Sequence, residues 1–212
     1  MLRRLCFATL LWTAALQPGL AAEKPVLDAG TEEPLKHAVR PSRELTHFVI
    51  GVIDKVYVEE LDDCLSQDKL KRRDYAALLR AVRIGAGGGR ALWFVRAAQG
   101  RYYCQALYGA HLFQYFLIEE QPPGAKAHYR LLFENGGDAF AIYAKKSHGL
   151  NDIEATGCIV DECRSARMSF DGSRYRTVKC TCSPIGGPPK KRRCGSDGMD
   201  DQSSGFASPC GS

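Results

Sequence analysis

Residues 164–182 read RSARMSFDGSRYRTVKCTC. The pair Asp171-Gly172 separates two segments, 164–170 and 174–182, that have the alternation of strands. Alternation of this kind is typical of a half-buried strand, and Asp-Gly readily adopts the positive φ angles of a two-residue hairpin turn. The sequence therefore predicts an antiparallel hairpin here, and we expect this hairpin to anchor a β-sheet.

Short segments rich in aromatic and β-branched residues precede this hairpin from about residue 90 onward. Two strong turn sequences, QPPG at 121–124 and NGGD at 135–138, separate some of them. Regular spacing with short connections favours an antiparallel sheet. The segments expected as strands are 91–97, 110–119, 128–134, 139–145, 152–160, 164–170 and 174–182.

Two helices are expected before these strands. Apolar residues recur at helical spacing from Leu45 to Tyr57, and Ser42 stands before them as a candidate N-cap. A second helix is expected from Asp74, with an apolar face reaching Val82 and a polar loop at 62–67 between the two. The predicted fold class is α+β, with two N-terminal helices packed on a mainly antiparallel, disulfide-bonded β-sheet.

The first 22 residues have the pattern of a secretory signal. Arg3 and Arg4 precede an apolar run over 5–16, and small residues follow at 19–22. The apolar run is too short to span a bilayer. We expect a periplasmic or secreted protein with no transmembrane segment after cleavage. The expected organisation is a signal peptide at 1–22, a lead-in segment at 23–41, a single domain at 42–182 and a disordered basic, Gly/Ser-rich tail at 183–212.

Nine cysteines are present, and Cys6 would be lost with the signal. The other eight would then lie in an oxidising compartment and form disulfides: Cys64, Cys104, Cys158, Cys163, Cys180, Cys182, Cys194 and Cys210. Their spacing does not suit zinc, and no metal or other cofactor is expected.

The predicted hairpin suggests how these cysteines pair. A two-residue turn places Cys163 opposite Cys180, within disulfide range, and Cys182 could then reach Cys158. A three-residue turn would instead place Cys180 opposite Arg164 and undo this pairing. The remaining expected pairs are Cys64 with Cys104 and Cys194 with Cys210.

The formal net charge of +5 becomes small once the termini are set aside. Without Arg3 and Arg4 the chain has 27 basic and 24 acidic residues, and the tail after Cys182 has four basic and three acidic ones. The body is therefore only +2. This charge does not indicate a nucleic-acid partner, and we expect a protein or another component of the cell envelope instead.

The search for catalytic chemistry leads to one loop, where Ser147, His148 and Asp152 lie close in sequence. Catalytic triads are usually assembled from distant segments, so we expect Asp152 to order the turn through its side chain. Neighbouring carboxylates such as Glu119-Glu120 point apart and do not form an acid pair. A hydrolase using His148 with Asp152 or Asp138 remains the alternative.

Two motifs in the last third of the body resemble a family signature. His148-Gly149-Leu150-Asn151-Asp152-Ile153 and Phe170-Asp171-Gly172-Ser173-Arg174-Tyr175-Arg176 resemble the Gly-x-x-Asp-Ile and Phe-Asp-Gly-x-x-Tyr motifs of small exported bacterial β-rich proteins, mostly uncharacterised. The resemblance covers about thirty residues and implies a bacterial envelope setting without catalytic residues. The small sheet architecture is also similar to that of periplasmic lysozyme inhibitors.

Taken together, these patterns predict an exported, non-enzymatic binding module of the inhibitor or immunity type. The alternative is a periplasmic cell-wall or small-ester hydrolase that uses His148 with a nearby acid. We expect most aromatics of the middle region to be sheet core and the others to contact a partner. The candidates for such contacts are Tyr102, Tyr103, Tyr108, Phe113 and Tyr115.

Overall fold

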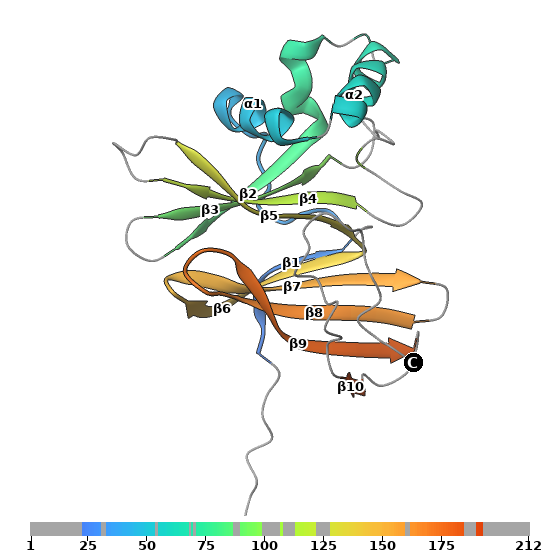
Figure 1. Ribbon diagram of the computed structural model, residues 1–212. Helices are drawn as coiled ribbons and strands as arrows, with labels where there is room; N and C mark the ends of the chain where they lie inside the picture. Colours follow the sequence, from blue (N-terminus) through green and yellow to red (C-terminus); the bar gives the residue numbers. More distant parts are fainter. Residues whose placement is uncertain are drawn as a thin grey trace, which may run out of the picture.

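A computed structural model shows two antiparallel sheets that face each other, with helices on the far side of one of them (Figure 1). It describes residues 23–192 except 31–32, 54, 68, 70, 87–89, 99–106, 108–112, 122–127, 160–161 and 185–189. The four-stranded sheet has the order β2 (Leu79–Gly85), β3 (Ala91–Ala97), β4 (Phe113–Glu120), β5 (Tyr129–Gly137). The six-stranded sheet has the order β1 (Pro25–Gly30), β6 (Ala139–Ser147), β7 (Leu150–Ile159), β8 (Glu162–Phe170), β9 (Tyr175–Pro184), β10 (Lys190–Arg192).

Three helical segments precede β2. They are α1 (Arg43–Val52), α2 (Lys55–Gln67) and the 3-10 helix η1 (Arg72–Leu78). The side chain of Ser42 caps α1 by accepting a hydrogen bond from the backbone N–H of Leu45, as its position in the sequence predicted. None of the helices in the described part of the chain is long and apolar enough to cross a membrane.

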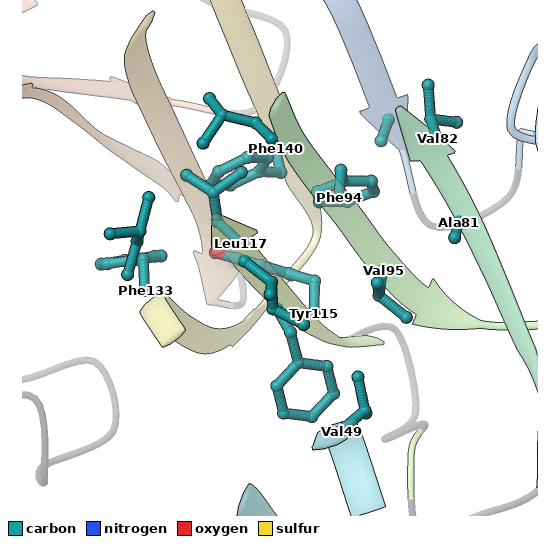
Figure 2. Close-up of a cluster of buried hydrophobic side chains, with 14 of the residues drawn as sticks. Val49, Ala81, Val82, Phe94, Val95, Tyr115, Leu117, Phe133 and Phe140 are labelled. Atoms are coloured by element: carbon teal, nitrogen blue, oxygen red, sulfur yellow. The ribbon is translucent and has the colours of Figure 1, made fainter. Parts of the chain in front are cut away.

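The core lies between the sheets and beneath the helices. Phe94 of β3 and Tyr115 of β4 meet Phe140 of β6 across the two sheets, with the Phe94 and Phe140 rings stacked 5.1 Å apart (Figure 2). Val49 of α1 is buried on the other side of the four-stranded sheet. Because β3 and β4 are covered on both faces, their sequences read as nearly continuous apolar runs rather than as alternating ones.

Four expectations about secondary structure and sheet organisation are wrong. The helix expected from Asp74 is a short 3-10 helix followed by strand β2. The second part of this segment is a strand because all seven of its residues pair with residues of β3. The polar loop expected at 62–67 belongs to α2, and the single expected sheet is divided into two. In the tail expected to be disordered, residues 190–192 pair with β9 as an edge strand.

The hairpin around Asp171-Gly172 exists, but its turn has four residues instead of two. Phe170 pairs with Tyr175, and the backbone N–H of Asp171 donates to the carbonyl of Arg174. The register also shifts between Arg167 and Met168, so Cys180 lies opposite Ala166.

This register changes the disulfides. Cys158 and Cys163, which are partners on adjacent strands β7 and β8, are bonded to each other. The predicted Cys163–Cys180 and Cys158–Cys182 bonds are therefore wrong. Cys64, Cys180 and Cys182 are also disulfide-bonded, whereas the predicted Cys104, Cys194 and Cys210 lie outside the described residues.

Candidate functional site

Four strand connections lie at one end of the two sheets, which we call the four-hairpin end. They follow β2, β4, β6 and β8, and Figure 1 shows the β6–β7 and β8–β9 turns there. Their described residues are 86 and 90, 121 and 128, 148–149 and 171–174. Loops that a rigid scaffold holds together are the usual place for binding residues.

The β6–β7 turn presents His148 to solvent. Ser147 pairs with Leu150, and both turn residues have positive φ angles, 48° at His148 and 82° at Gly149. Turns with this pattern match the twist of a hairpin, and histidine is one of the few side chains enriched in the left-handed region. The neighbouring turn is close, because a Cβ added at Gly172 would lie 3.8 Å from Nδ1 of His148.

A buried carboxylate lies beneath these turns. Glu119 of β4 is 1 % exposed, and its Oε2 accepts hydrogen bonds from Nε of Arg130 at 2.9 Å and Nε2 of Gln121 at 2.5 Å. Its Oε1 lies 3.1 Å from Nη1 of Arg90. The other terminal nitrogen of Arg90 donates to the carbonyl oxygen of His148 at 3.4 Å. Glu119 thus fixes two arginines, one of which reaches the turn of the other sheet.

Arg130 and Lys146 make further contacts between the sheets at this end. The guanidinium of Arg130 lies 5.7 Å from the ring centroid of Phe170 in β8. Nζ of Lys146 in β6 lies 3.5 Å from the carbonyl oxygen of Gly85 in β2. These contacts hold positive groups at the junction of the sheets.

The β8–β9 loop is ordered by Asp171. Its carboxylate accepts hydrogen bonds from the backbone N–H groups of Arg174 and Ser173, from the Ser173 hydroxyl and from Nε of Arg176. These bonds, with that from the Arg174 backbone first, hold the pKa of the Asp171 carboxyl well below its usual range. These hydrogen bonds therefore stabilise the conformation of a loop whose side chains are exposed.

Replacing Asp171 by asparagine is expected to destabilise the protein at neutral pH and progressively less in acid. The folded-state pKa of Asp171 is lowered, so its carboxylate stabilises the fold above the unfolded value of about 3.9. This stabilisation disappears as the pH falls from there toward the folded value. Denaturant unfolding of both proteins between pH 7 and pH 2 measures the difference. A difference that stays constant over this range would contradict the assignment.

The described side chains of the four-hairpin end carry more positive than negative charge. Glu119, Glu120 and Asp171 are acidic groups at this end, and each of them pairs with an arginine. Lys146 and Arg174 are exposed. The basic residues at this end are Arg83, Arg90, Arg130, Lys146, Arg174 and Arg176. The arrangement suits an acidic surface or another anionic group.

The structure separates the residues of the predicted hydrolase site. Asp152 is buried, and its Oδ1 accepts a hydrogen bond from the Ser147 hydroxyl at 2.8 Å, so it orders the turn as its sequence position predicted. Its Oδ2 lies 3.4 Å from Nζ of Lys145. His148 is exposed on the turn, and the described contacts of Asp152 do not include it. Asp138 precedes β6 and His148 follows it, so the two lie at opposite ends of that strand.

The predicted binding aromatics are not brought together on the described surface. Phe113 and Tyr115 of β4 are 1 % and 0 % exposed and belong to the core. Tyr102, Tyr103 and Tyr108 lie outside the described residues. In the part of the chain that the structure describes, no cluster of three or more His, Cys, Asp or Glu residues could hold a metal ion.

None of the protein-family models, curated proteins or solved structures compared with this chain matches it.

Sequence reasoning missed Arg90, Glu119 and Arg130. One available signal was the doublet Glu119-Glu120, whose side chains point apart as expected. Glu119 lies between the sheets, whereas Glu120 accepts a hydrogen bond from the Trp93 indole and pairs with Arg83. The sequence did not indicate which of the two is buried, because that depends on the second sheet.

Proposed function

We propose that this chain is an exported envelope protein that acts as a non-enzymatic binding module of the inhibitor or immunity type. The four-hairpin end binds an acidic surface of a partner protein. The signal-like segment 1–22 and the resemblance to exported bacterial β-rich proteins support the location, and the Cys158–Cys163 disulfide is compatible with an oxidising compartment.

The observation that carries the proposal is the way Glu119 holds Arg90 and Arg130. Both arginines keep part of their side chains exposed, 28 % and 42 %, while the carboxylate beneath them is buried. Guanidinium groups fixed before binding lose less side-chain entropy when a partner docks. A cluster of fixed positive groups also steers an acidic partner toward this end.

The setting of His148 favours a role in binding over one in catalysis. A general base needs a nucleophile and an orienting group within hydrogen-bond reach. The hydroxyl of Ser147 donates to buried Asp152, and the exposed imidazole lies beside Gly172 at the tip of the next turn. In this position it can contact a partner directly.

The test compares three proteins immobilised on a column over which an envelope extract is passed. They are the unaltered chain, the double variant Lys146→Gln/Arg174→Gln, and the control Lys71→Gln/Arg73→Gln. Both variants remove one exposed lysine and one exposed arginine, but the control residues lie at the start of η1, which leads into the opposite end of β2. We expect Lys146→Gln/Arg174→Gln to retain at least about tenfold less of the partner than the unaltered chain does. Retention by the unaltered chain should fall as salt is added.

Equal retention of the same partner by all three proteins would overturn the docking surface. Ester or cell-wall hydrolysis that is abolished by His148→Ala would overturn the non-enzymatic role. A partner that is lost from both variants to the same degree would show a dependence on net charge alone and would also contradict the assignment.

A further inference from the structure

A cavity lies at the other end of β2 and β3, away from the four-hairpin end. Its volume is about 200 Å³. One wall is apolar and comes from the segment that precedes α1, and the other carries two arginines from neighbouring strands. The lining residues are Pro34, Leu35, Ala38, Arg80, Arg96 and Ala97. A mixed wall of this kind is typical of a small-ligand site, where polar groups orient the ligand and apolar groups enclose it.

The two arginines are direct partners across β2 and β3, so they lie on the same face of the sheet. Side chains in such positions have Cβ atoms about 5 Å apart, and like charges there repel each other. Arg96 is 1 % exposed and is fixed by donating to the carbonyl oxygens of Gly30 and Glu33. Its guanidinium lies 4.9 Å from the ring centroid of Phe113. The positive group of Arg96 is therefore held in one position beside the cavity.

Arg80 has donors that the fold does not use. Its Nη1 donates to the carbonyl oxygens of Leu79, at 2.8 Å, and Ala77, at 3.4 Å. No carboxylate of the described residues pairs with Arg80, and its Nε and Nη2 have no hydrogen-bond partner among them. Nε–H and Nη2–H are parallel and match the two oxygens of a carboxylate. The open side of Arg80 thus has the geometry of a carboxylate receptor.

We propose that this cavity binds a carboxylate that carries a short apolar substituent. The carboxylate accepts two hydrogen bonds from Arg80, and the substituent packs against Pro34, Leu35 and Ala38. A cavity of about 150 Å³ accepts benzene, which has six heavy atoms, so this one has room for an acid the size of butyrate. The same chemistry is offered by a free short-chain acid and by the C-terminal carboxylate of a peptide.

Calorimetric titration of the purified full chain tests the proposal with three probes. Butyrate stands for a free acid, N-acetylalanine for a peptide end, and butyramide is the uncharged control. We expect saturable binding of at least one acid with a Kd on the order of 1 mM or below, and no binding of the amide. Tighter binding of butyrate indicates a free acid, whereas tighter binding of N-acetylalanine indicates a chain end.

Two variants and a matched control make the test specific. Arg80→Gln removes the receptor and is expected to weaken binding by at least about tenfold. Arg83→Gln removes the same charge from the same strand, but Arg83 points to the opposite face and pairs with Glu120, so binding should change by less than about twofold. Ala38→Phe fills the cavity from its apolar side and should abolish binding while both arginines remain.

Absence of saturable binding for both acids would overturn the proposal. So would equal loss of binding in Arg80→Gln and Arg83→Gln, or full binding by Ala38→Phe. Thermal unfolding of each variant shows whether it is folded. If Arg80→Gln is not folded, the binding of the acids by Ala38→Phe, compared with binding by the unaltered chain, decides whether the cavity is the binding site.

Discussion

Replacing Phe140 by alanine is expected to lower the free energy of unfolding by about 4 kcal/mol. Phe140 is 1 % exposed and belongs to β6, yet its ring contacts lie in the other sheet, with Phe94 stacked at 5.1 Å and Tyr115 at 4.7 Å (Figure 2). Removing the ring leaves a cavity between two sheets that the surrounding aromatics cannot close without moving.

Denaturant-induced unfolding measures this loss. Phe140→Leu, which keeps most of the volume, should cost no more than about 1.5 kcal/mol. Val178→Ala, at an exposed position of β9, should stay within about 0.5 kcal/mol of the unaltered chain. A loss below about 1 kcal/mol for Phe140→Ala would mean that the two sheets do not share this core.

Replacing Glu119 by glutamine is the second large expected effect, a loss of about 3 kcal/mol in the free energy of unfolding. The uncharged amide leaves Arg90 and Arg130 without their shared buried counter-charge. Because both guanidinium groups keep some contact with water, we place the loss at the lower end of the range for a broken buried ion pair. The β6–β7 turn should also loosen, since Arg90 links Glu119 to the carbonyl of His148.

Glu120→Gln is the matched control for this effect. Glu120 is the next residue on β4 and also pairs with an arginine, but on the more exposed face, where its side chain is 25 % exposed. Glu120→Gln should lower the free energy of unfolding by less than about 1 kcal/mol. Equal destabilisation by the two variants, measured by denaturant unfolding at pH 7, would show that Glu119 does not have the special role assigned to it.

Much of the strand content could be predicted from local pattern. The expected strands 91–97 and 139–145 correspond to β3 and β6, and the N-cap Ser42 marks the start of α1. These features depend on interactions between residues close in sequence, which a single chain segment already contains. The segment Leu79–Gly85 is expected as helix but forms strand β2, because its apolar spacing fits both structures and only pairing with β3 decides between them.

The sequence by itself determined that the second half of the chain forms antiparallel strands, and it pointed to the turns around His148 and Asp171. The tertiary structure decided the turn length, the Cys158–Cys163 bond and the position of Glu119. Asp171 accepts four hydrogen bonds from Ser173, Arg174 and Arg176, which stabilise a four-residue turn. A register shift between Arg167 and Met168 then places Cys180 opposite Ala166. Arg90 and His148 meet only because two sheets stack, and contacts between residues so distant in the chain depend on the whole packed core rather than on any local pattern.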